Sequence, residues 1–178
     1  MFSINIASGL GVRLRTVSED RDMPLLFQVY ACTRVDILTY DSWSQEEKHR
    51  FLEQQFLIQH KAYMTGYENP EFYILSRNDT DIGRLYLEQR TSEIRIIDIA
   101  LLPEFRNSGV GTALLQDILN CADKQGKRVS IHVEKNNPAL SLYNRLGFTK
   151  KEEIPFYDLM ETQVSKKVHQ RGDRCVTI

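Results

Sequence analysis

The chain has 178 residues, of which 42% are hydrophobic, and its 23 basic and 24 acidic residues leave a net charge of −1. That size and balance suit a single globular domain. No stretch of about 18 consecutive apolar residues occurs, so we expect neither a membrane anchor nor a membrane partner. The three cysteines form no CxxC pair, which favours a reducing, cytoplasmic setting over a disulfide scaffold.

Residues 163–178 carry a small excess of basic side chains and no apolar periodicity. We expect them to form a flexible tail after a single domain at 1–162. The positive charge of such a tail serves solvation, so we predict no nucleic-acid partner.

The first ninety residues predict strands and helices in alternation. Alternating side chains indicate the first strand, an apolar run after Pro24 fits a helix, and a capping box from Ser44 to Glu47 opens a second helix. Turn-forming residues then separate two further strands. The expected elements are a strand at 12–17, a helix following Pro24, a helix from Ser44 with Leu52 and Phe56 on its apolar stripe, and strands at 71–76 and 82–89.

The most informative segment is an apolar strand at 93–102 that runs through Arg106-Asn107-Ser108-Gly109-Val110-Gly111 into an amphipathic helix. The first N–H groups of a helix are unpaired, and glycines lack a Cβ, so a diphosphate can lie directly against this backbone. Arg106 would add a full positive charge. Two glycines at a helix start also serve a tight turn, and neither a P-loop nor a dinucleotide fingerprint fits.

The apolar face of that helix ends near Gly126 and a short strand follows at 129–133. A second motif then extends from Asn136 to Phe148. Residues 149–154 and 157–162 predict a closing hairpin.

Arg106-x-x-Gly109-x-Gly111, Asn137-Pro138-Ala139 and Leu142-Tyr143-x-x-Leu146-Gly147-Phe148 together resemble the GNAT superfamily of N-acetyltransferases, with the best match over 81–150. The resemblance implies an α/β fold with a mixed, mostly antiparallel twisted sheet, flanking helices and a splayed central strand pair. It implies acetyl-CoA as cosubstrate and direct transfer to a primary amine, either a small molecule or a peptide. The resemblance leaves open whether the protein forms a homodimer.

The resemblance also places the cosubstrate. Backbone groups of a bulged strand at 93–102 would pair with the pantetheine amides, and the glycine loop would hold the diphosphate. The residues expected to bind acetyl-CoA are Leu101, Leu102, Arg106, Asn107, Ser108, Gly109, Val110, Gly111, Thr112, Asn137 and Tyr143.

Tyr143 is the candidate proton donor to the departing thiolate, although it would equally pack in the core. Asp98 is a candidate base, because an unpartnered buried carboxylate has a raised pKa, and a structural hydrogen bond explains it equally well. Glu93 and Glu88 are expected to be more exposed, where either would reach the amine through water or be a solvated surface carboxylate. His132 alternates away from apolar neighbours and faces the gap, or is a half-buried strand histidine.

Neither His49 nor His60 belongs to a cluster with metal-site spacing, and both are expected on a solvent-facing helix surface, so we predict no catalytic metal. Aromatic residues supply either an acceptor pocket or core anchors: Tyr40, Trp43, Tyr63, Tyr67, Phe156 and Tyr157. A non-catalytic acyl-CoA sensor or interaction module would keep the glycine loop but would not need Tyr143.

Overall fold

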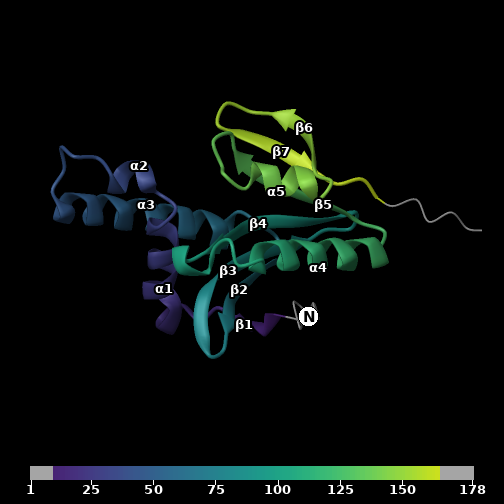
Figure 1. Cartoon of the computed structure of the whole chain (residues 1–178), viewed down its shortest axis with the longest axis horizontal. Coiled ribbons are helices and arrows are strands. Elements are labelled where there is room, and N and C mark those ends of the chain that lie inside the picture. Colours follow the sequence, from purple (N-terminus) through teal and green to yellow (C-terminus); the bar gives the residue numbers. More distant parts are fainter. Residues whose placement is uncertain (1–9, 165–178) are drawn as a thin grey trace, which may run out of the picture.

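The computed structural model describes residues 10–164, so the predicted tail lies almost entirely outside the described residues. Within them, seven strands form one sheet in the order β1-β2-β3-β4-β5-β7-β6 (Figure 1). Only the β4–β5 pair is parallel among the described strands. The mixed, mostly antiparallel sheet is therefore confirmed. Its strands are β1 (Val12–Thr16), β2 (Pro70–Arg77), β3 (Thr80–Gln89), β4 (Glu93–Leu101), β5 (Arg128–Glu134), β6 (Thr149–Glu153) and β7 (Tyr157–Glu161).

Helices cover both faces of the sheet (Figure 1). Two of them, α1 and α3, pack on one face, and α4 and α5 pack on the other. The helices are α1 (Glu19–Ala31), α2 (Val35–Leu38), α3 (Gln45–Thr65), α4 (Val110–Lys124) and α5 (Leu140–Arg145), with a 3₁₀ turn, η2, at Pro103–Phe105.

Side chains that alternate between the two faces of the central strands form two hydrophobic cores, one on each side of the sheet. On β3, Leu85 and Leu87 join the larger core beneath α4, whereas Tyr86 between them joins the core beneath α1 and α3. Successive strand side chains point to opposite faces, so β3 is buried on both sides. This central strand holds β4 in a fixed position.

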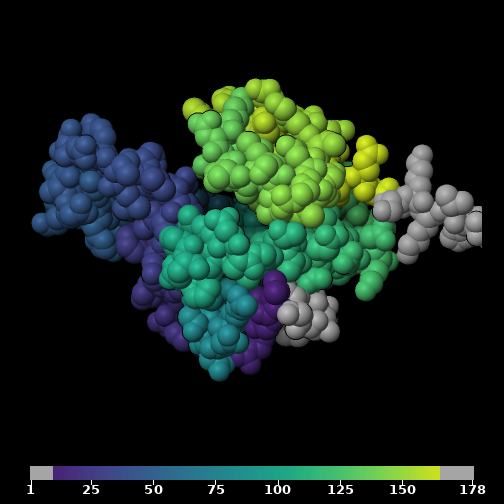
Figure 2. Space-filling model, in the orientation of Figure 1, coloured from purple at the N-terminus to yellow at the C-terminus, as the bar shows by residue number. Residues whose placement is uncertain are grey.

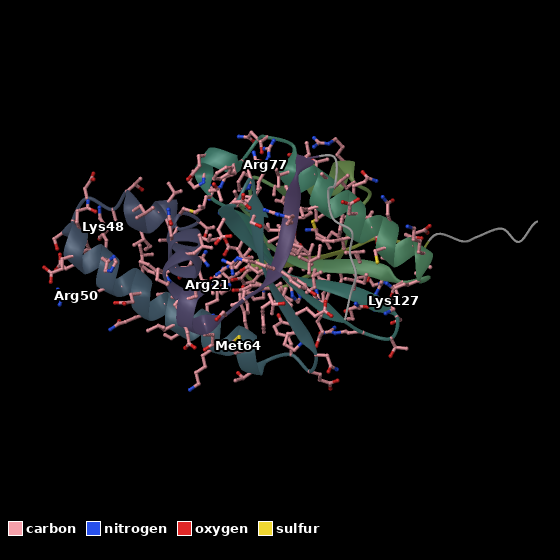
Figure 3. All side chains as sticks on the ribbon, turned by 90° about the horizontal axis from the view of Figure 1, so that it is seen from below. Arg21, Lys48, Arg50, Met64, Arg77 and Lys127 are labelled. Atoms are coloured by element: carbon pink, nitrogen blue, oxygen red, sulfur yellow. The ribbon has the colours of Figure 1, made fainter. Side chains whose placement is uncertain are left out.

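The local start signals behave as expected, with one addition. The capping box of α3 is present, since the Glu47 N–H donates to Ser44 Oγ and the Ser44 N–H donates to the Glu47 side chain. Helix α1 begins at Glu19, so Pro24 lies inside it rather than before it. The short helix α2 had no counterpart in the sequence analysis. In Figure 3, Lys48 and Arg50 mark the outer end of α3, which extends beyond the sheet.

Strands β4 and β5 separate after four residue pairs. Their register runs from Glu93 opposite Arg128 to Ile96 opposite Ile131, and both strands continue beyond it without pairing to each other. At the same point β4 bulges against β3, because Leu87 faces Ile96 while Tyr86 faces Asp98. The splayed pair implied by the resemblance is present, and it opens a gap in the middle of the sheet.

Candidate active site

From the end of β4 that is not paired with β5, the chain continues through η2 and a short loop into α4. Gly109 precedes that helix in the left-handed region, with φ of 83°, and no side chain caps the helix start. A Cβ at Gly109 would meet nothing within 4 Å, and one at Gly111 would meet only Leu142 Cδ2, at 3.9 Å. The space before the helix is therefore open, and its first N–H groups are available to an anion. These features fit the diphosphate of a CoA molecule.

The other loop residues shape this turn. Asn107 has φ of 56°, a left-handed conformation that asparagine tolerates better than most residues. The Ser108 hydroxyl donates to the Phe105 carbonyl at 2.5 Å. Val110 is fully buried in the core beneath α4, which anchors the helix start, and Thr112 lies in the first turn. The loop thus presents backbone rather than side chains to the gap.

The guanidinium of Arg106 points to protein atoms. Its Nε donates to the Leu101 carbonyl at 2.9 Å, and its Nη2 lies 3.2 Å from the Cys32 carbonyl and 2.9 Å from Cys32 Sγ. The side chain is otherwise exposed. The expected placement of this charge beside a diphosphate stays a prediction.

Leu101 and Leu102 differ in what their backbones contact. The Leu102 N–H donates to the Ile82 carbonyl at 2.9 Å, and the Leu102 carbonyl accepts from Phe105. Successive peptide groups of a strand point to opposite edges, so those of Leu101 and Ile99 face the gap. Leu101 is the better placed of the two expected pantetheine contacts.

Asn137 forms the turn that starts α5. Its Oδ1 accepts from the Ala139 N–H at 2.8 Å, and its carbonyl accepts from the Leu140 N–H at 3.1 Å. The side chain therefore orients the helix that carries Tyr143. A direct contact between Asn137 and CoA stays a prediction.

Tyr143 is 4% exposed, and its ring meets Phe148 edge-on at 5.6 Å between centroids. Burial raises the pKa of Tyr143, and the charge of Asp98 raises it further. Because Asp98 belongs to β4 and Tyr143 to α5, this coupling acts across the gap. The phenol stays protonated at any physiological pH.

Asp98 has a partner, contrary to the expectation of an unpaired carboxylate. The Arg84 guanidinium donates to it at 2.7 Å from the neighbouring strand, and Arg84 is only 3% exposed. Burial, the Asp98 charge and a hydrogen bond to Asp98 raise the pKa of Tyr63 on α3. The alternative of a structural hydrogen bond therefore fits this residue.

The expected exposure of Glu88 and Glu93 is wrong, since they are 4% and 5% exposed. Arg90 donates to both carboxylates, and Arg128 donates to Glu93 at 3.0 Å. Burial alone would raise the pKa of Glu93, but the Arg128 hydrogen bond and the charges of Arg95 and Arg90 hold it below its usual value. Arginines thus occupy the lone pairs that a base would need.

His132 is the first residue of β5 beyond the last pair with β4, and it is exposed. Its partial burial and the charge of Arg95 lower its pKa, so it is neutral at pH 7. His60, by contrast, is buried at 9% exposure, which corrects the solvent-facing position expected for it. His60 is buried because the side of α3 that carries it faces α1.

Residues 10–164 contain no group of three or more His, Cys, Asp or Glu side chains arranged to hold a metal ion. No helix in this part of the chain is long and apolar enough to cross a membrane.

A notch separates α2 and α3 from the lobe of β5, β6, β7 and α5 (Figure 2). Arg34, just after α1, pairs across this region with Glu134 at the end of β5, at 2.9 Å. Phe156 and Tyr40, two of the aromatics considered for the acceptor, are 78% and 50% exposed. Tyr63 instead packs edge-on against the buried Tyr86.

Comparison with known proteins agrees with this geometry. The sequence model of the acetyltransferase (GNAT) family matches residues 32–148. An N-alpha-acetyltransferase of Sulfurisphaera tokodaii is 29% identical over 89 residues, which cover 48% of this chain and 53% of that protein. An uncharacterized N-acetyltransferase of Methanocaldococcus jannaschii is 24% identical over 127 residues, covering 66% of this chain and 56% of the relative.

Solved structures share the fold. The PaiA N-acetyltransferase of Thermoplasma acidophilum in complex with coenzyme A has a TM-score of 0.61 at 19% identity, over 85% of this chain and 98% of that one. The ribosomal-protein-S18-alanine N-acetyltransferase of Escherichia coli has a TM-score of 0.57 at 17% identity, over 94% and 99%. The chain spans between 10% and 57% of the length of the curated relatives it matches. Because the family match covers more than half of its residues, this chain belongs to the GNAT acetyltransferase family.

Proposed function

We propose that the protein transfers the acetyl group of acetyl-CoA to a primary amine by direct attack in a ternary complex. One observation carries the proposal. The β4–β5 pair splays beside an uncapped, glycine-lined helix start, and the helix that follows β5, α5, carries the buried Tyr143. An acyl-CoA sensor would need the helix start but not the tyrosine.

The chain offers a backbone site for the cosubstrate. The open space at Gly109 and Gly111 suits the diphosphate, and the gap-facing peptide groups of Ile99 and Leu101 suit the pantetheine amides. Bound there, acetyl-CoA supplies an activated acyl thioester. A gap-facing N–H of β4 would also stabilise the oxyanion that develops on attack.

Tyr143 would act as a hydrogen-bond donor to the leaving sulfur. A CoA thiol has a pKa of about 8.5, and the pKa of Tyr143 lies above its usual value. Complete proton transfer from the phenol to the thiolate is therefore uphill. Its proton stays on the oxygen and offsets the charge that develops on sulfur.

Three side chains are candidates for the general base that removes a proton from the amine. Asp98 is held by Arg84, and Glu93 is held by Arg90 and Arg128. His132 is exposed at the start of the gap, and its lowered pKa leaves it unprotonated at pH 7. We therefore assign removal of the amine proton to His132, directly or through water. Asp98 and Glu93, held in ion pairs, would instead fix the electrostatic environment of the gap.

The acceptor that fits best is an α-amine of a protein or peptide. Its pKa of about 8 leaves part of it neutral, so a weak base such as imidazole suffices, whereas a lysine-type amine near 10.4 needs more help. The names of two similar proteins, an N-alpha-acetyltransferase and a ribosomal-protein-alanine acetyltransferase, support this class.

The test is release of CoA thiol in the presence of N-terminal peptides, amino acids, polyamines and aminoglycosides, one at a time. We expect the fastest release with peptides whose only amine is the α-amine. Release with lysine side chains or polyamines alone would overturn the acceptor class. CoA binding without release for any amine would favour the sensor.

A further inference from the structure

Arg106 contacts three groups outside its own loop. Its fork reaches the Leu101 carbonyl at the end of β4, and the carbonyl and sulfur of Cys32 at the end of α1. Residues 32 and 106 are far apart in sequence, yet these contacts bring the end of α1 to the loop that precedes α4. One exposed side chain therefore joins the glycine loop, the gap edge of β4 and a helix on the opposite face of the sheet.

Helix α1 has a specific need for this cation. Its last turn contains no basic residue of its own, and Cys32 is its C-cap. The carbonyl end of a helix carries partial negative charge, which a nearby cation stabilises. Arg106 supplies that cation from the cosubstrate loop, and its planar fork binds two carbonyl oxygens at once.

The segment after α1 is also tied to the other side of the gap. Arg34 pairs with Glu134 at 2.9 Å and lies over the Tyr30 ring, 5.1 Å from its centroid. Residues 32–34 are thus fastened to β4 through Arg106 and to β5 through Glu134. This short segment bridges the two splayed strands.

Building on the proposed function, we propose that Arg106 is a positioning residue for the acceptor. Its side chain holds residues 32–34 across the gap and is not a ligand of the CoA diphosphate. The cosubstrate loop contributes its backbone to CoA and its arginine to the acceptor side.

The kinetic test compares Arg106→Ala and Arg106→Lys with the native protein. A lysine keeps the charge but cannot form the fork, so both variants should raise the acceptor KM about tenfold, the factor expected for one hydrogen bond to a charged group. The CoA Kd, measured by calorimetry, should change less than about threefold. Arg50→Ala, at the outer end of α3 in Figure 3, removes an exposed arginine elsewhere and should change neither constant.

Arg34→Gln offers an independent variant, because it releases residues 32–34 from Glu134 without touching the glycine loop. We expect a higher acceptor KM and an unchanged CoA Kd. The proposal is overturned if Arg106→Ala weakens CoA binding about tenfold, Arg106→Lys restores it, and the acceptor KM is constant. That pattern would make Arg106 a phosphate ligand.

Alkylation of Cys32, followed by peptide mass mapping, tests the contact without any activity. Burial raises the pKa of the Cys32 thiol, while Arg106 favours its thiolate; Arg84 and Glu104 also face it. Arg106→Ala should therefore move the pH midpoint of Cys32 alkylation upward. An unchanged midpoint would show that Arg106 does not contact Cys32 and would overturn the proposal. Failure of the native protein to bind CoA or transfer acetyl would instead overturn the proposed function. The pH dependence of Cys32 alkylation would still show whether Arg106 contacts Cys32.

Discussion

The proposed chemistry depends first on single side chains whose surroundings differ from those of a free residue. Tyr143 combines near-complete burial with the charge of Asp98 across the gap, and both raise its pKa. A phenol in that position donates a hydrogen bond and does not ionise. Its removal should therefore act on the chemical step rather than on binding.

We expect Tyr143→Phe to lower kcat about a hundredfold, the lower range for loss of one preorganised hydrogen bond to a developing negative charge. The KM for acetyl-CoA should stay nearly constant, because the ring and its packing on Phe148 remain. Thiol release under saturating amine measures the effect. Tyr73→Phe is the matched control, since it removes a hydroxyl that bonds Glu71 on β2. Equal rates in native and Tyr143→Phe proteins would remove this residue from the mechanism.

The lowered pKa of His132 predicts the acid side of the pH profile. Only neutral imidazole accepts a proton, so kcat/KM should rise with pH through a value below the usual 6.5 and then depend on the amine alone. His132→Gln should lower kcat/KM at pH 7 and abolish that acid limb. Steady-state rates between pH 5 and 9 on one peptide acceptor measure both effects. An acid limb that survives the substitution belongs to another group.

Residue environments were the part of the site that the sequence did not predict. Glu93 is caged by arginines from the β3–β4 turn and from β5, and Asp98 meets Arg84 only through a register that contains a bulge. Those neighbours are set by strand pairing, which no local pattern specifies. Tyr143 and the glycines were proposed as site residues from motifs, and each of these motifs is local to one turn.

At the scale of elements, the start of α4 is the feature on which the proposed binding of the cosubstrate depends. A Cβ at Gly111 would contact only Leu142, at 3.9 Å, so the position accepts a Cβ without strain. A tryptophan there would take up space at the helix start that the diphosphate needs. We expect Gly111→Trp to abolish CoA binding, measured by calorimetry, with little change in Tm. Gly111→Ala is the control and should retain most of the affinity. Unchanged affinity in the tryptophan variant would contradict the loop assignment.

Elements with strong end signals were predicted well, and short ones were not. The capping box at Ser44, the turn before β3 and the closing hairpin all occur close to where the sequence placed them. Helix α2 has only four residues, too few to show a period, and depends on its packing against α3. Its absence from the sequence analysis left one side of the notch undefined.

At the scale of the whole molecule, a polar cluster fastens α1 to the β1 side of the sheet. Asp22 on α1 is 2% exposed and accepts from Arg15 of β1 at 2.7 and 2.9 Å, from Arg21 at 2.9 Å and from the Ser18 N–H at 2.8 Å. Arg15 also pairs with Asp81 on β3. The cluster fastens α1 to the strands that support β4, so the position of residues 32–34 depends on it.

Asp22→Asn should therefore destabilise the whole domain, by about 3 kcal/mol at pH 7, because it removes a buried carboxylate that accepts hydrogen bonds from Arg15, Arg21 and Ser18. Burial by itself would raise the pKa of Asp22, but the hydrogen bonds from Arg15, Arg21 and Ser18 hold it far below the usual value. A depressed carboxyl pKa stabilises the fold above the unfolded value of about 3.9 and loses that effect as the pH falls further. Urea unfolding, followed by the fluorescence of the single tryptophan, Trp43, measures this effect. The difference in the free energy of unfolding between native and variant proteins should be constant from pH 7 to 5 and should shrink below about pH 4.

Asp79→Asn is the control, because it breaks an exposed pair with Arg13 and should cost less than about 0.5 kcal/mol at any pH. A difference for Asp22→Asn as small as this control would mean that water or neighbouring groups compensate for the carboxylate, and that α1 is held to the sheet by its apolar face alone.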